Sequence, residues 1–200
     1  MIQQLSLFPD NYIKNVIGKR TNNNSGLPKA LLSSDSNEWY TPKEHVEAAR
    51  ALMRGEIDLD PASNELANRV IKANKFYTIG DNGYNKAWYG NVWLNPPYGR
   101  SADDDNKSNQ ELWSAKLISE YKYGNVKEAV LLVNAVTDRR WFQPLWDYPI
   151  CFTDHRIKFY SPDTQAGQPT HGNALVYFGN NLTGFVKEFK KFGVIAKKLG

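Results

Sequence analysis

Short, mostly apolar runs along the chain indicate the strands of a sheet. They cover residues 91–94, 129–133, 150–153 and 173–178. The run 129–133 is apolar throughout, which is typical of a strand buried on both faces. Residues 57–59 are expected to form the first strand of a parallel sheet, and 156–160 to continue the strand 150–153. The pair 150–153 and 173–178 is expected to form an antiparallel hairpin at the sheet's edge.

Apolar positions at helical spacing lie between these runs. A helix is predicted over residues 42–54. Thr41 is a good N-cap, Pro42 suits the first helical position and Glu44 completes a capping box. The apolar face consists of Val46, Ala49, Leu52 and Met53, and Gly55 ends the helix.

Two further helices follow from the same periodicity. Apolar residues between Leu112 and Tyr121 predict a helix that covers the sheet. From Phe185 onward, Phe189 and Phe192 share a helical face, and lysines occupy the remaining positions. The C-terminal lysines are therefore expected to form the solvated face of a terminal helix.

The alternation of strands and helices predicts an α/β fold in a single compact domain, residues 37–200. Residues 1–36 contain runs of Asn, Ser and Gly without periodicity, so they are expected to form an N-terminal arm or linker. The segment 64–80 is short for a further helix and strand. No separate target-recognition domain is visible in the sequence.

Composition limits the class of protein further. The chain has 200 residues, of which 41% are hydrophobic and 23% charged, as in an ordinary globular domain. No run approaches the roughly 20 apolar residues of a membrane span, and no secretory signal is visible, so a cytoplasmic location is expected. The single cysteine, Cys151, leaves no disulfide framework and no Cys cluster for zinc. A net charge of +4 is consistent with a polyanionic partner.

The sequence Asn95-Pro96-Pro97-Tyr98 breaks the apolar run 91–94 abruptly, because proline cannot donate to a sheet ladder. The break brings together a side-chain amide, a backbone carbonyl without a neighbouring N–H, and an aromatic ring. Such a set can hold a planar ring that carries an exocyclic amine. Asn95 Oδ1 and the Pro96 carbonyl would accept the two amine hydrogens, and Tyr98 would cover the ring face. A proline-rich turn with a packed tyrosine is the alternative interpretation.

At this motif the chain resembles the amino-methyltransferases that use S-adenosylmethionine, whose signature is Asp or Asn followed by Pro-Pro and an aromatic residue. The Asn-Pro-Pro-Tyr form is most similar to the adenine-specific DNA enzymes. Trp-Tyr-Thr-Pro at 39–42, Asp-Pro-Ala at 60–62 and Asp-Asn-Gly at 81–83 precede it. In this order they resemble the compact phage and prophage DNA adenine methyltransferases, over residues 38 to about 180. A Rossmann dehydrogenase would instead need Gly-x-Gly-x-x-Gly, which is absent.

The resemblance implies a Rossmann-like class I methyltransferase sheet, mostly parallel with an antiparallel edge hairpin, and helices on both faces. It implies that Asn95, Pro96, Pro97 and Tyr98 are catalytic. It also implies that one group of residues binds S-adenosylmethionine: Tyr40, Thr41, Pro42, Asp60, Pro61, Ala62, Ser63 and Asp81. Asp60 would pair with the ammonium group of the cofactor's methionine, and the Thr-Pro segment would line the cofactor site. No metal is implied.

Each of these cofactor-binding assignments has a simpler alternative. Thr-Pro is a helix start, Asp-Pro starts turns, and Asp81 belongs to the turn signal Asp-Asn-Gly. The chain also departs from the family at Ser63 and Asn64, which replace glycines. Asn64 is expected to supply a left-handed turn there.

Double-stranded DNA is the partner that the resemblance implies. Arg100, in the polar loop 99–110, is the expected phosphate contact, together with Arg156 and Lys158, and residues 161–172 form a second DNA-facing loop. The same chemistry could also methylate a cytosine amine or a protein glutamine. A catalytically inactive DNA-binding relative is a further alternative. The sequence does not specify the DNA recognition site, the ribose-binding residue, the oligomeric state, or a role in anti-restriction or regulation.

Overall fold

The structure is a computed structural model that describes residues 40–101, 106–159 and 171–199. All of them belong to one structural unit, which extends from Ser36 to Gly200. The predicted arm, residues 1–36, lies outside the described residues, as do most of the predicted DNA-facing loop 161–172 and part of the loop 99–110.

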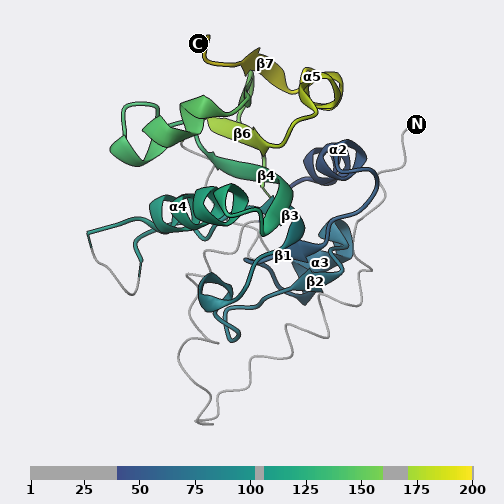
Figure 1. Cartoon of the computed structure of the whole chain (residues 1–200), viewed down its shortest axis with the longest axis vertical. Helices are drawn as coiled ribbons and strands as arrows, with labels where there is room; N and C mark the ends of the chain where they lie inside the picture. The colour runs from purple at the N-terminus through teal and green to yellow at the C-terminus, as the bar shows by residue number, and fades with distance from the viewer. Residues whose placement is uncertain (1–39, 102–105, 160–170, 200) are drawn as a thin grey trace, which may run out of the picture. The chain divides into compact units, whose positions relative to one another are not determined.

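A single seven-stranded sheet forms the centre of this unit (Figure 1). In spatial order its strands are β2 (Lys75–Phe76), β1 (Leu59–Asp60), β3 (Gly90–Leu94), β4 (Val126–Asn134), β6 (Asn173–Phe178), β5 (Ile150–Thr153) and β7 (Gly193–Ala196). The pairs from β2 to β4 are parallel, and the pairs from β4 to β7 are antiparallel. The sheet is therefore mixed, with a larger antiparallel part than the single edge hairpin predicted from the sequence.

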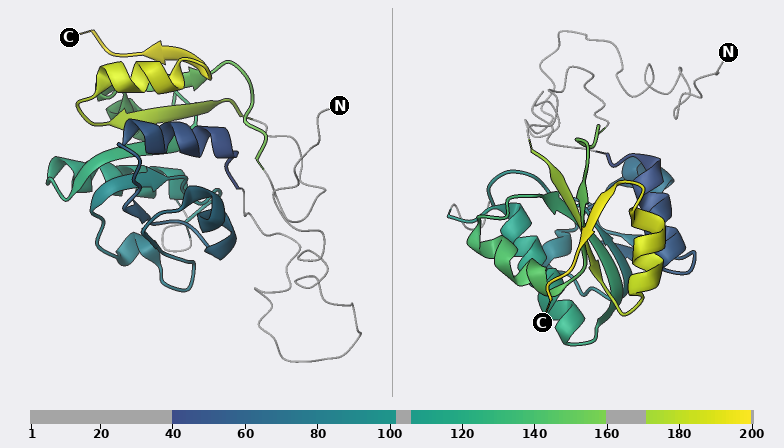
Figure 2. Two further views of the ribbon diagram at one scale, coloured as in Figure 1. Left: turned by 90° about the vertical axis from the view of Figure 1, so that its right-hand side faces the viewer. Right: turned by 90° about the horizontal axis from the view of Figure 1, so that it is seen from above.

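Helices cover both faces of the sheet (Figure 2). On one face lie α2 (Lys43–Leu52), α3 (Glu65–Ile71) and α5 (Leu182–Phe189), packed on a core that includes Trp93 and Val130. On the other face lie α4 (Asn109–Lys122) and the 3-10 helices η2 (Gly83–Asn85) and η3 (Arg140–Asp147), on a core that includes Leu94 and Leu131. Consecutive residues of β3 and β4 thus point into different cores, as the alternation of side chains along a strand requires.

The strands predicted at 91–94, 129–133, 150–153 and 173–178 are confirmed, and β6 pairs with β5 in the antiparallel sense that was expected. The helix predicted to cover the sheet is confirmed as α4, and the predicted apolar face of α2 is buried. The first strand is shifted by about one residue from the prediction, to Leu59–Asp60.

The start of α2 differs from the prediction. The helix begins at Lys43 with Pro42 as its N-cap residue, and no side chain caps it. The predicted capping box of Thr41 and Glu44 is therefore wrong. Glu44 is exposed, whereas Thr41 is only 7% exposed and turns its hydroxyl toward another partner, described below.

The segment 64–80 holds both a helix and a strand, α3 and β2, although it was judged short for them. This is possible because α3 has only seven residues and β2 only two. Asn64 is extended rather than left-handed, with φ −150°, because it serves as the N-cap of α3 and accepts a hydrogen bond from Ala67 N–H.

The C-terminal helix is shorter than predicted. It ends at Phe189, and Gly193–Ala196 forms β7, which pairs with β5. Val194 and Ile195 are β-branched, which favours a strand over a helix at these positions. Residues 156–159 form no regular strand, so the predicted continuation of β5 is also wrong over the described part of 156–160.

Candidate active site

The carboxyl ends of β1, β3 and β4 lie at one edge of the sheet, because these strands are parallel and adjacent. Leu59 pairs with Val92, so Asp60 at the end of β1 lies next to the strand that leads into Asn95. Ligands of such sheets bind beyond the carboxyl ends of the strands. This edge is therefore the candidate active site.

Asp60 is a buried carboxylate, 1% exposed, whose Oδ1 accepts a hydrogen bond from Ala62 N–H at 3.1 Å. Burial raises its pKa to about 7, and the bond from Ala62 N–H and the Ser63 side chain oppose this shift. No described cation acts on the carboxylate. A buried carboxylate without a cation is costly, so the position suits a cationic group of a ligand.

The residues after Asp60 are held from two sides. Ser63 N–H donates to the Tyr77 carbonyl at 2.9 Å, beside the end of β2. Gly83 lies against Pro61, and a Cβ at Gly83 would be only 2.0 Å from the Pro61 carbonyl oxygen. The turn that contains Asp81 therefore packs directly on the Asp-Pro-Ala segment, and a glycine is needed at position 83.

Asp81 itself acts within its turn. Its Oδ2 accepts hydrogen bonds from the Thr78 N–H and hydroxyl, both at 2.8 Å, and these bonds lower its pKa. The side chain is exposed. A role of Asp81 in cofactor binding stays a prediction.

Tyr40 and Thr41 join the two predicted motifs. Asn64 Nδ2 donates to Tyr40 Oη at 3.1 Å, and Asn95 Nδ2 donates to Thr41 Oγ1 at 3.3 Å. The segment before α2 thus contacts the end of the Asp-Pro-Ala-Ser-Asn stretch and the start of Asn-Pro-Pro-Tyr. The structure thus brings the sequence-predicted residues Tyr40, Thr41 and Asn95 together with Asn64, from three separate parts of the chain.

The Asn-Pro-Pro-Tyr turn is partly exposed and belongs to neither core cluster. Pro96 is buried, Pro97 is exposed, and Asn95 and Tyr98 are partly buried. The Asn95 Oδ1 atom is buried, and its carboxamide is oriented by the bond to Thr41. The turn therefore has both a fixed amide and access to solvent.

Tyr98 packs edge-on against Phe159, with ring centroids 6.1 Å apart and planes at 71°. Its hydroxyl is buried and bonds to none of the described residues, and burial raises its pKa. Phe159 and Asn64 are the residues of this site that the sequence predictions missed. The signal for Phe159 was the apolar residue in Arg-Ile-Lys-Phe, which was assigned to a strand instead.

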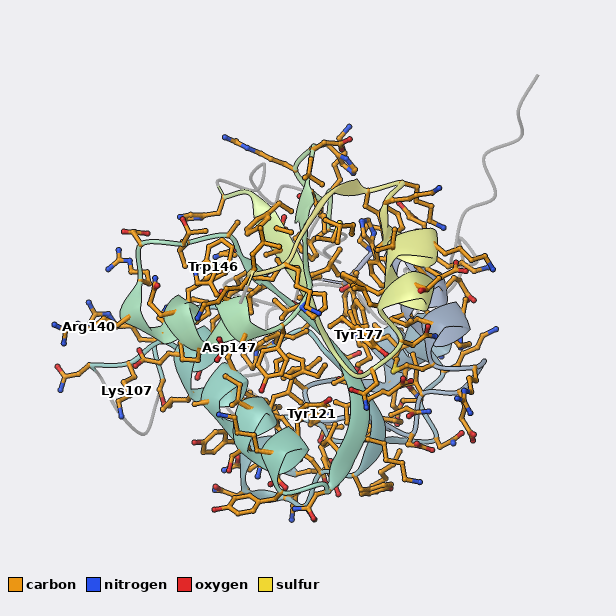
Figure 3. All side chains as sticks on the ribbon, turned by 45° about the horizontal axis from the view of Figure 1, so that its top comes forward. Lys107, Tyr121, Arg140, Trp146, Asp147 and Tyr177 are labelled. Carbon is orange, nitrogen blue, oxygen red and sulfur yellow. The ribbon has the colours of Figure 1, made fainter. Side chains whose placement is uncertain are left out.

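The predicted DNA-contacting residues Arg100, Arg156 and Lys158 are exposed in segments that follow the carboxyl ends of β3 and β5. Lys107 and Arg140 follow β3 and β4, and Figure 3 shows both pointing outward on the same side of the unit. The described residues contain no cluster of three or more His, Cys, Asp or Glu side chains able to hold a metal ion. Among the same residues, no helix has the length and apolar character needed to cross a membrane.

This fold and site define an α/β protein whose buried carboxylate and Asn-Pro-Pro-Tyr turn both lie at the carboxyl ends of adjacent parallel strands in a mixed sheet. The family comparison is more specific. Residues 29–193 match the family described as DNA N-6-adenine-methyltransferase (Dam), and the chain belongs to this family. The resemblance noted in the sequence is thereby confirmed.

A relative from Escherichia phage T1, described as a DNA N-6-adenine-methyltransferase, is 32% identical over 107 residues. The match covers 52% of this chain and 38% of the relative, so the chain spans less than half of that protein's length. No solved structure matches the chain significantly.

Proposed function

We propose that this chain transfers a methyl group from S-adenosylmethionine to the exocyclic amine of adenine in double-stranded DNA. The observation that carries the proposal is the meeting of Asn95 with the Tyr40–Thr41 segment, next to the strand that ends at Asp60. Membership of the Dam family supports DNA adenine as the acceptor. The parallel strands β2, β1, β3 and β4 followed by antiparallel β6 support a Rossmann-like class I methyltransferase fold.

The residues at the end of β1 fit the cofactor. Asp60 is buried and has no cationic partner among the described residues, and the α-ammonium group of the cofactor's methionine would supply one. Tyr40 and Pro42 would line the same site from the segment that leads into α2. S-adenosylmethionine, when bound, supplies an electrophilic methyl group.

The acceptor side of the site begins at Asn95. The target adenine would leave the base stack, at a cost of a few kcal/mol, and enter edge-first against the turn. Asn95 Oδ1 and the Pro96 carbonyl would accept the two amine hydrogens, which directs the nitrogen lone pair toward the methyl group. Tyr98 would stack on the base. The gain in rate comes mainly from holding the two reactants in line.

Transfer leaves one extra proton on the methylated nitrogen. The Asn95 carboxamide accepts hydrogen bonds but is too weak a base to keep this proton, so the proton passes on to solvent through the partly exposed turn. Arg100, Arg156, Lys158 and the outward-pointing Lys107 and Arg140 would contact DNA phosphates around the site.

The test is methyl transfer by the whole chain from tritiated S-adenosylmethionine to duplex DNA, single-stranded DNA, RNA and a glutamine-containing protein, assayed side by side. We expect label in DNA, recovered as N6-methyladenine after digestion to nucleosides. Label in methylcytosine or in protein would assign another acceptor. DNA binding without transfer, and no heat of binding to S-adenosylmethionine by calorimetry, would indicate an inactive relative.

A further inference from the structure

The Thr41 hydroxyl is placed differently from an ordinary helix cap. Thr41 precedes Pro42 at the start of α2, yet no side chain caps this helix. The hydroxyl oxygen instead accepts a hydrogen bond from Asn95 Nδ2 at 3.3 Å. Thr41 is only 7% exposed, so little water competes for this bond.

A carboxamide has two chemically different ends. Oδ1 accepts hydrogen bonds, whereas Nδ2 only donates them. An amine can bind only to the Oδ1 end, because the reverse orientation would set two donors against each other. In the productive orientation the partly buried Nδ2 group needs an acceptor of its own, since a donor that is withdrawn from water and left unsatisfied is costly.

We propose that Thr41 is a positioning residue, which holds the Asn95 carboxamide with its nitrogen toward α2 and its Oδ1 toward the methyl-accepting amine. The orientation of the Asn95 carboxamide is inferred from its contact with Thr41 alone. The effect of that orientation on catalysis rests on the proposed function. This role differs from direct binding of the cofactor by Thr41, since it acts on the transfer step and not on cofactor affinity.

Tyr40 adds to the same arrangement. Its hydroxyl accepts a hydrogen bond from Asn64, the residue that caps α3, so the backbone on the N-terminal side of Thr41 is tied to the cofactor side of the site. The segment on the other side continues into α2, whose Val46 and Ala49 are fully buried. The backbone is thus fixed on both sides of Thr41, by the Tyr40–Asn64 bond before it and by the packing of α2 after it.

The test compares three variants of the whole chain. Thr41→Val keeps the shape and removes the hydroxyl, Thr41→Ser keeps the hydroxyl, and Thr153→Val is the matched control. Thr153 is a partly buried threonine that donates its hydroxyl to a backbone carbonyl, that of Asn173, at 3.2 Å. The measurements are single-turnover methyl transfer to duplex DNA at saturating cofactor, and the Kd for S-adenosylmethionine by calorimetry.

We expect Thr41→Val to slow transfer about ten- to a hundredfold, the cost of leaving the Asn95 Nδ2 donor without its acceptor. Its Kd for the cofactor should stay within about twofold of the wild type, and Thr41→Ser and Thr153→Val should transfer at nearly the wild-type rate. A weaker cofactor Kd in Thr41→Val, with an unchanged rate at saturation, would show that Thr41 binds the cofactor and overturn the inference.

A measurement that does not depend on activity separates this inference from the proposed function. The side-chain amide protons of Asn95 can be assigned by NMR through their loss in Asn95→Asp. One of them should be shifted and slow to exchange in the wild type and in Thr41→Ser, and lose both features in Thr41→Val. An Asn95 signal unaffected by Thr41→Val refutes the positioning role, even where methyl transfer is absent and the proposed function itself has failed.

Discussion

Asp58 lies immediately before β1 and Asp60 is its last residue, and the surroundings of the two carboxylates differ sharply. Asp58 Oδ2 accepts a hydrogen bond from Asn91 N–H at 2.7 Å and is partly exposed. Gly90 makes room for it, because a Cβ there would lie 2.2 Å from the same oxygen. Asp60 is buried, has one backbone donor, and has no described cation nearby.

Two tyrosines repeat this contrast. Tyr177 lies beside α5 (Figure 3), stacked on Phe185 at 5.2 Å, and its hydroxyl donates to Glu128 at 2.8 Å and accepts from Asn181 N–H at 3.0 Å. The buried Tyr98 hydroxyl has no bond to the described residues. Asp58 and Tyr177 thus have hydrogen-bond partners within the chain. At the carboxyl edge the Asp60 carboxylate has no described cation and the Tyr98 hydroxyl has no described hydrogen-bond partner, at a cost in stability.

Among the substitutions proposed for these two pairs of residues, Asp60→Asn should change the free energy of unfolding most. The pKa of Asp60 is raised from 3.8 to about 7 in the folded protein, so its ionised form is disfavoured there. The loss of stability caused by ionising this buried carboxyl is absent below pH about 4, grows as the pH rises, and reaches its full value above pH 7. Asparagine keeps the acceptor for Ala62 and never ionises. Relative to wild type, the variant should gain about 2 kcal/mol of stability at pH 5 and about 4 kcal/mol at pH 8.

Urea unfolding of the ligand-free protein at the two pH values measures this gain. Asp58→Asn is the matched control and should lose about 1 to 3 kcal/mol, because it weakens the bond to Asn91 N–H. Equal gains for Asp60→Asn at pH 5 and pH 8 would contradict the burial of an unpaired carboxylate. Asp60→Asn should also bind S-adenosylmethionine weakly, so stability and binding change in opposite directions.

Asn95→Ala should reduce methyl transfer by about 10² to 10³, the usual cost of removing one positioned polar group at a reacting centre. Cofactor binding should be nearly unchanged, because Asp60 and the start of α2 are retained. Incorporation of tritiated methyl into DNA under single-turnover conditions, with calorimetry for the cofactor, checks both parts. Undiminished transfer would remove Asn95 from the mechanism.

Much of the sheet could be predicted from the sequence, since buried strands must be apolar on both faces and the run 129–133 is. Asn-Pro-Pro-Tyr could be placed at a strand end, because two prolines stop a ladder. Short elements could not be predicted in the same way. The strand β2 has only two residues and β7 only four, and partners far away in the sequence determine that they are strands.

The role of Thr41 shows why the site was harder to predict than the sheet. A threonine hydroxyl can cap a helix or bond a distant side chain, and the local pattern Thr-Pro-x-Glu predicts the cap. The partner found, Asn95, is 54 residues away in the chain. Asp60 was predicted to lie just beyond the first strand and is the last residue of it, whereas its burial depends on the packing of segments around it. Local sequence therefore located the polar residues but not their partners.

The pH dependence of cofactor affinity tests the proposed role of Asp60 at the carboxyl edge of the sheet. Pairing with an ammonium group favours the ionised form of Asp60, whose pKa is about 7 without ligand. Affinity for S-adenosylmethionine should therefore fall as the pH drops below 7, by up to about tenfold per pH unit. It should also fall above pH about 8, where an α-amino group loses its proton. Calorimetry from pH 5.5 to 8.5 tests this, and Asp60→Asn should abolish only the acid-side decrease.

The smallest effects are expected from removing the hydroxyl of each of the two tyrosines. Tyr177→Phe should lose about 1 to 3 kcal/mol of stability, because Glu128 and the Asn181 N–H lose a buried partner. Tyr98→Phe should be neutral or slightly stabilising, since its hydroxyl has no bond to lose among the described residues, and the ring remains for stacking on the base. Chemical denaturation measures the change in stability of each variant, and the methyl-transfer rate of Tyr98→Phe shows whether the ring still serves. If Tyr98→Phe lost as much stability as Tyr177→Phe, the two hydroxyls would not differ in the way the structure indicates.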